Sequence, residues 1–303
     1  MNYFIVLALL YIIVRTIFQG YLKSNKTDRY SVSLISSGLT FSFFLGYYFI
    51  RNNYSFNFER LKEIIFNKYA LIEGVSSQGY FFALISALPL LPFSLSTPLT
   101  SIWLFFALFL EPFILDDYSM NLSIIGIFIL FVLGLLTINY HHISKGFNLK
   151  KYPQFKLGII LLIISSLSRA IQVTNTKKIG HMYETDELIL MSFALTFLIA
   201  ITMFLYKYLF TDYKPYLDKV FYLILICFFV NNLSVFLRFY SIQNISEDLF
   251  ILITQTAIIL SIFIGYYFFK EKIMLNQLIG FLIIVTSIYL MIKNENSDIK
   301  IHK

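Results

Sequence analysis

The sequence is poor in the residues that soluble enzymes and metal proteins depend on. Cys227 is the only cysteine among 303 residues, which excludes an intramolecular disulfide and a cysteine-based metal cluster. Charged residues make up only 14% of the chain. Walker A, G-x-G-x-x-G, G-x-S-x-G and H-E-x-x-H motifs are all absent. ATP-driven pumping within this chain and the familiar hydrolase chemistries therefore lack support.

Apolar residues dominate instead. They form 58% of the chain, and the mean hydropathy is +0.74. A helix needs about 20 apolar residues to cross a bilayer, and runs of that length recur along the whole sequence. We expect about ten transmembrane helices in an all-α integral membrane protein, at residues 3–22, 32–50, 71–91, 94–115, 121–140, 156–175, 186–206, 218–240, 248–269 and 275–292.

An internal repeat relates the two halves of the chain. At a constant offset of about 154 residues, Arg15 falls on Arg169, Ser77 on Asn231, Gln78 on Asn232, Asp117 on Glu271, and Gly126 on Gly280. Five helices per half is an odd number, so the second copy must enter the membrane from the opposite side. The sequence thus predicts two inverted five-helix repeats, residues 1–150 and 151–303.

The longest polar break, residues 51–70, carries its own helical pattern. Phe58, Leu61, Ile64, Ile65 and Tyr69 can share one face of a short helix, which we expect to lie in the membrane interface. The net charge of +7 is carried mostly by loops and tails, where it suits anionic lipid headgroups rather than nucleic acid. Lysines and arginines occur in breaks on both sides, so charge does not settle the topology.

The segment ITQTAIILSIFIGYYFFKEKIMLNQLIGFLIIVTSIYLMI, residues 253–292, resembles the end of EamA-type permeases of the drug/metabolite transporter superfamily. The resemblance lies in a charged turn at Lys270, Glu271 and Lys272, followed by Ile279 and Gly280 opening the last helix. It implies ten helices in two inverted halves, cytoplasmic termini and a central cavity serving alternating access. The first helix departs from the family, because LLYIIVRTIFQG stands where a Trp-Gly pair is common.

Two arginines are the leading candidates for ligand contact. Arg15 and Arg169 lie inside predicted helices, where a charge facing lipid costs about 2.5 to 3.5 kcal/mol. Gln19 and Gln172 extend polar stripes on the same helices. The alternative is that both arginines snorkel towards headgroups. As ligand contacts, they favour a carboxylate or phosphate.

Further polar side chains are candidates for the cavity wall. Ser77 shares a helix face with Tyr80, and Asn231 shares one with Ser234 and Arg238. Hydrogen bonds that merely hold helices together are the alternative. The remaining predicted substrate contacts are Gln78, Trp103, Asn232 and Gln255.

A few residues are assigned roles other than substrate contact. Glu73, just inside the third span, is a candidate coupling carboxylate, although a helix N-terminus would also stabilise its charge. His141 and His142 end the fifth span, where we expect an interfacial loop. Gly126 and Gly280 open the last helix of each half and permit close helix approach.

The predicted function is secondary transport, and no enzymatic activity is expected. The chain would export or exchange a small polar or amphipathic organic metabolite across the inner or plasma membrane. A multidrug, amphiphile or lipid-linked-precursor translocase is the alternative within transport. A polytopic acyltransferase acting on an envelope glycan, using His141 or His142, is the alternative from another class. We expect no cofactor, no metal and no nucleic acid. We expect membrane lipids to surround the protein, and the sequence is compatible with a homodimer.

Overall fold

The computed structural model describes residues 3–52, 58–115, 122–144, 153–180, 182–244, 250, 253–254 and 256–301, and this part of the chain is helical without strands. The first half contains α1 (Tyr3–Ser24), α2 (Arg29–Arg51), α3 (Phe58–Ile65), α4 (Lys68–Ala87), η1 (Leu88–Leu90), α5 (Phe93–Thr100), α6 (Trp103–Ile114) and α7 (Leu122–Ser144). The second half contains α8 (Phe155–Gly180), α9 (Thr185–Phe210), α10 (Val220–Ile226), η2 (Cys227–Asn231), α11 (Asn232–Asn244), α13 (Ala257–Phe269) and α14 (Leu275–Ile301).

Six helices in the described part are long and apolar enough to cross a membrane. They are Tyr3–Ser24, Arg29–Arg51, Lys68–Leu90, Phe155–Gly180, Thr185–Phe210 and Val220–Asn244. Shorter apolar helices cover Ile125–Ile138, Ala257–Phe269 and Leu275–Ser287. Eight of the ten predicted spans coincide with these elements to within about five residues, whereas 94–115 matches none of them and 248–269 overlaps only Ala257–Phe269. The described part of the chain is thus all-helical with multiple apolar helices, as predicted, and the number of ten crossings stays a prediction.

Polar side chains mark where several helices begin. Asp28 caps α2, since its Oδ1 accepts hydrogen bonds from the backbone N–H groups of Tyr30 and Ser31 at 3.0 and 3.1 Å. Asn67 caps α4 by accepting from the N–H of Tyr69 at 2.9 Å. Glu184 and Glu187 form a capping box at the start of α9. These side chains lie in the polar breaks between apolar stretches and fix where the next helix begins.

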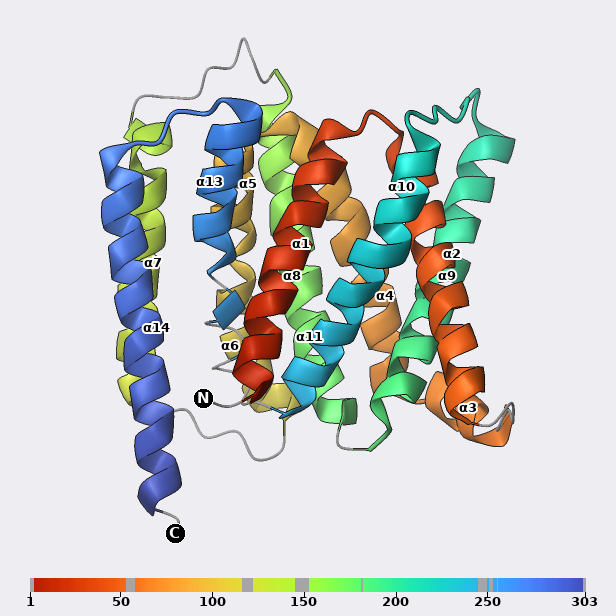
Figure 1. The fold of residues 1–303 in the computed structure, drawn as a ribbon, viewed down its shortest axis with the longest axis horizontal. Coiled ribbons are helices and arrows are strands. Elements are labelled where there is room, and N and C mark those ends of the chain that lie inside the picture. The colour runs from red at the N-terminus through yellow and green to blue at the C-terminus, as the bar shows by residue number, and fades with distance from the viewer. Residues whose placement is uncertain are drawn as a thin grey trace.

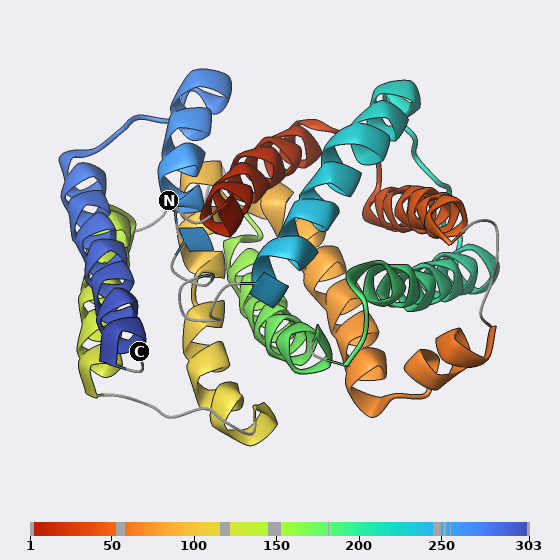
Figure 2. The ribbon, with the colours of Figure 1, turned by 60° about the horizontal axis from the view of Figure 1, so that its bottom comes forward.

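The helices form one broad bundle whose two edges are each made by one helix from either half (Figures 1 and 2). α7 and α14 pack together at one edge, and α2 packs against α9 at the other. Between them, α4 packs on α8 and α1 on α11. The first turn of α1 and the last turn of α14 lie at the same end of the bundle (Figure 1).

α7 and α14 come into close backbone contact at two glycines, Gly134 and Gly280. A Cβ atom at Gly280 would lie 2.6 Å from the carbonyl oxygen of Gly134 and 2.7 Å from the backbone nitrogen of Ile138. The predicted close approach at Gly280 is therefore confirmed. The same expectation for Gly126 is wrong, because a Cβ there would meet nothing within 4 Å. The glycine that faces Gly280 is Gly134, which the repeat does not pair with it.

Two polar clusters join the halves at the helix ends. The carboxylate of Glu271 accepts hydrogen bonds from the N–H groups of Phe93 and Ser94 at 2.8 and 2.9 Å, and Lys23 Nζ lies 3.7 Å from its Oε1. In the second cluster, Asp28 accepts hydrogen bonds from the hydroxyl of Tyr213 and from the N–H of Tyr216, the latter at 3.2 Å. Both clusters connect segments far apart in the chain, by 178 residues in the first and 185 in the second.

Four details differ from the sequence-based expectations. The predicted span 94–115 is two helices, α5 and α6, interrupted at Ser101 and Ile102. The predicted span 218–240 contains a π-helical turn, η2, between α10 and α11. His141 and His142 belong to the last turn of α7 rather than to a loop. The short helix expected within residues 51–70 is present as α3, although Tyr69 belongs to α4, and its place in the membrane interface stays a prediction.

Candidate functional site

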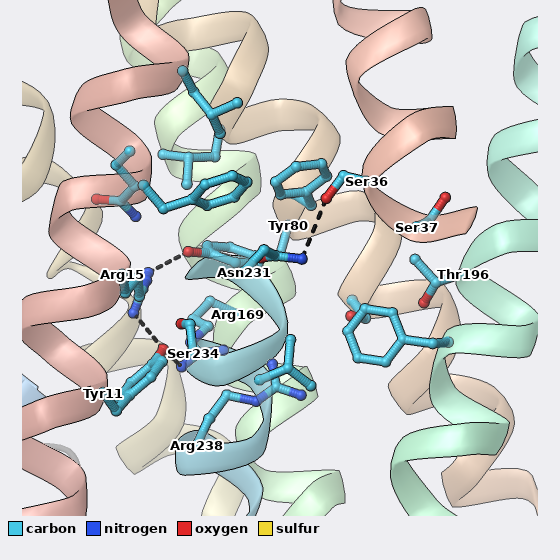
Figure 3. A pocket seen from close by; sticks show the side chains of 18 residues that line it. Tyr11, Arg15, Ser36, Ser37, Tyr80, Arg169, Thr196, Asn231, Ser234 and Arg238 are labelled. Atoms are coloured by element: carbon cyan, nitrogen blue, oxygen red, sulfur yellow. Dashed lines mark hydrogen bonds between the residues drawn. The ribbon is translucent and has the colours of Figure 1, made fainter. Parts of the chain in front are cut away.

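A pocket lined by charged, polar and apolar side chains lies at the centre of the bundle and contains about 650 Å³ of space not filled by protein atoms, part of it open to solvent (Figure 3). Helices from both halves line it: α1, α2 and α4 from the first, and α8, α9, η2 and α11 from the second. The lining residues are Tyr11, Arg15, Phe18, Gln19, Leu22, Ser36, Ser37, Ser77, Tyr80, Phe81, Leu84, Arg169, Phe193, Thr196, Asn231, Ser234, Val235 and Arg238.

Tyrosine hydroxyls hold the two arginines that the repeat relates. The hydroxyl of Tyr11 accepts a hydrogen bond from Arg15 Nη1 at 2.9 Å and another from Arg169 Nη2 at 2.8 Å. Arg15 Nη2 donates to the hydroxyl of Tyr80 (Figure 3). Arg15 and Arg169 both lie over the Tyr80 ring, with their Cζ atoms 5.3 and 5.2 Å from its centroid. Neither guanidinium snorkels to a helix end; both are held inside the bundle.

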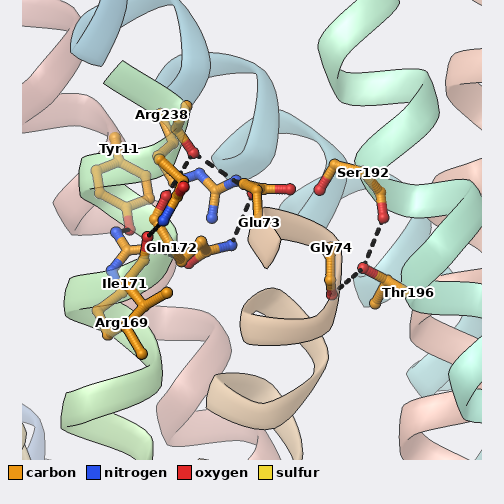
Figure 4. A network of polar contacts seen from close by, with 11 residues as sticks. Tyr11, Glu73, Gly74, Arg169, Ile171, Gln172, Ser192, Thr196 and Arg238 are labelled. Atoms are coloured by element: carbon orange, nitrogen blue, oxygen red, sulfur yellow. Dashed lines mark hydrogen bonds and ion pairs between the residues drawn. The ribbon is translucent and has the colours of Figure 1, made fainter. Parts of the chain in front are cut away.

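A second network, shown in Figure 4, adjoins the pocket where α4, α8 and α11 meet. Glu73 Oε1 lies 3.5 Å from Arg238 Nη2, and it accepts weak hydrogen bonds from Gln172 Nε2 at 3.3 Å and Thr176 Oγ1 at 3.4 Å. The amide oxygen of Gln172 in turn accepts from Arg169 Nη1 at 2.7 Å. The network therefore connects the carboxylate of Glu73 to the guanidiniums of Arg169 and Arg238.

The π-helical turn η2 forms the part of the pocket wall that packs against α2. Asn231, the last residue of η2, donates from Nδ2 to Thr40 Oγ1 at 2.9 Å and to Ser36 Oγ at 3.3 Å. A π turn inserts one residue into a helix and is frequent at functional sites. Here the turn ends at the residue whose side chain ties the second half to α2 of the first.

Apolar side chains line another part of the pocket. On α1, Phe18 and Leu22 follow Tyr11 and Arg15 at about one-turn intervals, with Gln19 between them, so this helix contributes both polar and apolar residues to the pocket. Phe18 and Leu22 belong to the same buried apolar cluster as Leu84 of α4. The pocket can thus receive a ligand with a charged group and an apolar body.

The pocket brings together part of the predicted site. Six predicted substrate contacts line it: Arg15, Gln19, Ser77, Arg169, Asn231 and Arg238. Gln172 and Glu73 lie behind it, in the network of Figure 4. Gln255 is outside the described residues.

Three predicted contacts lie away from the pocket. Gln78 is buried between helices and donates to Ser33 Oγ at 2.7 Å. Trp103 is 3% exposed and packs in the apolar core, although its ring lies 5.8 Å from Arg169 Cζ. Asn232 is buried and does not line the pocket. Gln78 and Asn232 each directly follow a lining residue, so on a helix they point about 100° away from it.

Sequence reasoning missed several lining residues. Ser36 and Ser37 on α2, and Phe193 and Thr196 on α9, were not singled out. Tyr11 was missed as well, although it stands one helical turn before Arg15, which is the spacing at which a hydroxyl can accept from that arginine. Among the described residues, no group of three or more histidine, cysteine, aspartate or glutamate side chains could hold a metal ion.

Comparisons with known proteins agree with this architecture. Residues 156–293 match the model of the EamA-like transporter family, which confirms the resemblance seen at residues 253–292. One crystal structure superposes with a TM-score of 0.68 at 11% sequence identity, covering 95% of this chain and 94% of that chain. At this identity the likeness shows a shared fold, and it includes the first half of the chain. No curated protein matches in sequence.

Proposed function

We propose, on the premise that residues 156–293 belong to the EamA-like transporter family, that this multi-pass membrane protein is a secondary transporter. It exports or exchanges a small polar or amphipathic organic metabolite by alternating access. The observation that carries the proposal is the central pocket. Polar and charged side chains from apolar helices of both halves converge there, and buried charges inside a membrane bundle mark ligand pathways.

The helix packing supports two inverted five-helix repeats, residues 1–150 and 151–303. At the offset of 154 residues, α1 corresponds to α8, α2 to α9, α4 to the α10–α11 segment, and α7 to α14. If each helix is replaced by its counterpart in the other half, the packed pair α4–α8 becomes the packed pair α11–α1. The pairs α2–α9 and α7–α14 each map onto themselves. All four pairs are present, as a two-fold relation through the pocket requires.

The same repeat gives a mechanism. Alternating access in such folds moves one repeat against the other around a fixed central site. Here the site is shared between halves, because Tyr11 of α1 binds Arg169 of α8 and Asn231 of η2 binds Thr40 of α2. A shift between halves would change these contacts and the access to the pocket together. We place the protein in the inner or plasma membrane with cytoplasmic termini, surrounded by lipid and able to form a homodimer.

A translocase for amphiphiles or lipid-linked precursors is the second candidate. The apolar part of the pocket, with Phe18, Leu22 and Leu84, favours it. By contrast, an acyltransferase using His141 or His142 gains no support, because no α7 residue is found among the described residues that line the pocket.

Transport by purified protein in liposomes tests the proposal. Vesicles would be screened for uptake and counterflow of amino acids, organic acids, phosphorylated metabolites and amphiphilic amines. Ser77→Trp fills the pocket, whereas Val75→Trp places the same ring on the outer face of α4, where Val75 is 58% exposed. We expect transport to be lost only with Ser77→Trp, in protein that still elutes as a folded species. Equal transport by both variants would contradict a pathway through the pocket.

A further inference from the structure

The pocket contains more positive than negative charge. Arg15, Arg169 and Arg238 line it, and no aspartate or glutamate is found among its described lining residues. Glu73 is the carboxylate that adjoins it, and the ion pair of Glu73 is with Arg238. Three guanidiniums against one carboxylate leave an excess of two positive charges at the pocket and its adjoining network.

Neutral groups hold the two arginines that lack a carboxylate. Arg15 donates to the hydroxyls of Tyr11 and Tyr80, and Arg169 donates to Tyr11 and to the amide oxygen of Gln172. These partners orient the guanidiniums without neutralising them. A purely structural buried arginine is normally paired with a counter-ion, because an uncompensated buried charge is costly.

Hydrogen-bond donors are left over in the same place. Arg169 and Arg238 are 1% and 7% exposed, and the Nε–H of each has no hydrogen-bond partner in the protein. Both side chains line the pocket. Buried polar groups are almost always paired with protein, water or a ligand, so these donors point to an acceptor that enters the pocket.

The arrangement selects the chemistry of that acceptor. Guanidinium groups bind carboxylate and phosphate through paired N–H donors, and several guanidiniums around one cavity match a group that carries more than one negative charge. The apolar residues Phe18, Leu22 and Leu84 line the pocket as well, and they suit a hydrocarbon or aromatic body.

We propose that the ligand of this pocket is a doubly charged amphipathic anion, with a phosphomonoester or dicarboxylate group among Arg15, Arg169 and Arg238 and an apolar body against Phe18, Leu22 and Leu84. This assignment rests on the proposed function only in treating the ligand as the transported solute. The binding chemistry stands on the pocket alone.

Calorimetric binding by the purified full-length protein in uncharged detergent tests the assignment. Phenyl phosphate, benzoate and benzyl alcohol keep one ring while the headgroup carries two, one and no negative charges. We expect binding to weaken in that order. Arg169→Gln removes one charged donor group and is expected to weaken phenyl phosphate binding about 10- to 100-fold, since such hydrogen bonds differ by that much in affinity.

Two further variants serve as controls. One tests whether the charge or the planar shape of the Arg169 side chain matters, and the other tests the effect of removing an arginine outside the pocket. Arg169→Lys keeps the charge but loses the planar fork, so binding should be intermediate between wild type and Arg169→Gln. Arg51 lies at the end of α2, outside the pocket, and pairs with Glu184 and Asp186 at 3.1 and 2.7 Å. Arg51→Gln is the matched control, and it should leave binding unchanged. Equal weakening by Arg51→Gln would overturn the assignment.

The phosphate chemistry could be presented by a soluble solute or by a lipid headgroup, and phosphatidic acid added to the micelles distinguishes these sources. Displacement of phenyl phosphate by phosphatidic acid in wild type but not in Arg169→Gln supports the same site with a lipid source. Absence of displacement supports a soluble anion. Binding of benzyl alcohol as tight as that of phenyl phosphate overturns the anion assignment for either source.

The binding and transport experiments test the anion site and the transporter proposal independently. If phenyl phosphate binds through Arg169 yet no solute crosses liposomes, the anion site is supported and the transporter proposal is contradicted. If neutral solutes are transported and phenyl phosphate neither binds nor competes, the transporter proposal is supported and the anion site is overturned.

Discussion

Glu73 and Arg238 face each other beside the central pocket, with 3.5 Å between Oε1 and Nη2, and their side chains are 1% and 8% exposed. They come from α4 and α11, one helix of each half. Arg238 also lines the pocket, whereas Glu73 lies behind it. This pair therefore connects the charge of the pocket to the packing of the two halves.

Breaking this pair should destabilise the protein. Glu73→Gln leaves Arg238 buried without its counter-ion, and such changes cost about 3 to 5 kcal/mol. Arg238→Gln should cost a similar amount, while the double variant should cost less than the sum, since no charge is then left unpaired. Unfolding free energies measured in detergent give the coupling. Additive costs would show that the two residues do not interact.

Glu73 is also the candidate coupling carboxylate. Its Oε2 has no hydrogen-bond partner, and Arg238 on α11 is the charged group facing it in the described part of the chain, with neutral Gln172 and Thr176 on α8. If protonation of Glu73 releases Arg238 during transport, an imposed pH gradient should drive solute accumulation in wild type and not in Glu73→Gln. Counterflow, which needs no gradient, reports that the variant remains active. Unchanged gradient-driven accumulation by Glu73→Gln would exclude this role.

The contact between α7 and α14 should not tolerate a methyl group at its centre. Gly280→Ala places Cβ 2.6 Å from a backbone oxygen, and overpacking of this kind costs about 1 to 3 kcal/mol. Gly126→Ala on α7 is the control, because its Cβ would meet nothing within 4 Å and alanine favours helix by up to about 1 kcal/mol. Thermal unfolding in detergent should separate the two variants. A Gly280→Ala protein as stable as Gly126→Ala would contradict the close packing.

The carboxylate of Glu271 should stabilise the junction of α5 and α13. Glu271→Ala removes the acceptor for two backbone N–H groups, and a buried donor left unpaired costs about 1 to 3 kcal/mol. Glu271→Gln keeps one acceptor oxygen and should lie between alanine and wild type. Lys272→Gln changes an exposed charge in the same turn and should stay within about 0.5 kcal/mol of wild type. Unfolding free energies of the three variants, measured in detergent, test this order. A Glu271→Ala protein as stable as Lys272→Gln would contradict a stabilising role of the carboxylate.

Alkaline pH should loosen the contact between the loop after α9 and the start of α2. Partial burial and the hydrogen bond to Asp28 raise the pKa of Tyr213 from 10.0 to about 12. A raised pKa means that this contact stabilises the fold fully below about pH 10 and is lost as pH rises through about 12.

Tyr213→Phe should therefore lose less stability than wild type between pH 10 and 12. Tyr216→Phe, which changes a 56% exposed ring in the same loop, should behave as wild type. Melting temperatures across this range test the sign. A steeper loss of stability in Tyr213→Phe than in wild type would refute it.

Apolar run length predicted most helices of this protein, because the thickness of a bilayer imposes one length on every crossing. Breaks inside a run were not predictable in the same way. The interruption at Ser101 and Ile102 and the π turn Cys227–Asn231 both lie within stretches that carry no charged residue. Their geometry follows from tertiary packing, which overrides local pattern.

The most useful sequence signal for the pocket was a charged residue inside an apolar helix, because such residues are rare. Arg15, Arg169 and Arg238 stand out because a charge inside an apolar helix needs a reason, and all three line the pocket. Tyr11 and Thr196 do not stand out, since tyrosine and threonine are common in membrane helices and only the neighbouring helix decides what they face. Trp103 shows the converse, because its uniqueness in the sequence carried no information about the pocket.

The π turn also leaves a trace in the register of the proposed repeat. Its inserted residue has no counterpart in α4, which is regular along its whole length. Ser77 pairs with Asn231 at an offset of 154 residues, but before the turn Tyr69 pairs with Tyr222 at an offset of 153. Arg15 and Arg169, further upstream, pair at 154 again, so the one-residue shift is confined to the helix segment just before the point where Asn231 enters the pocket.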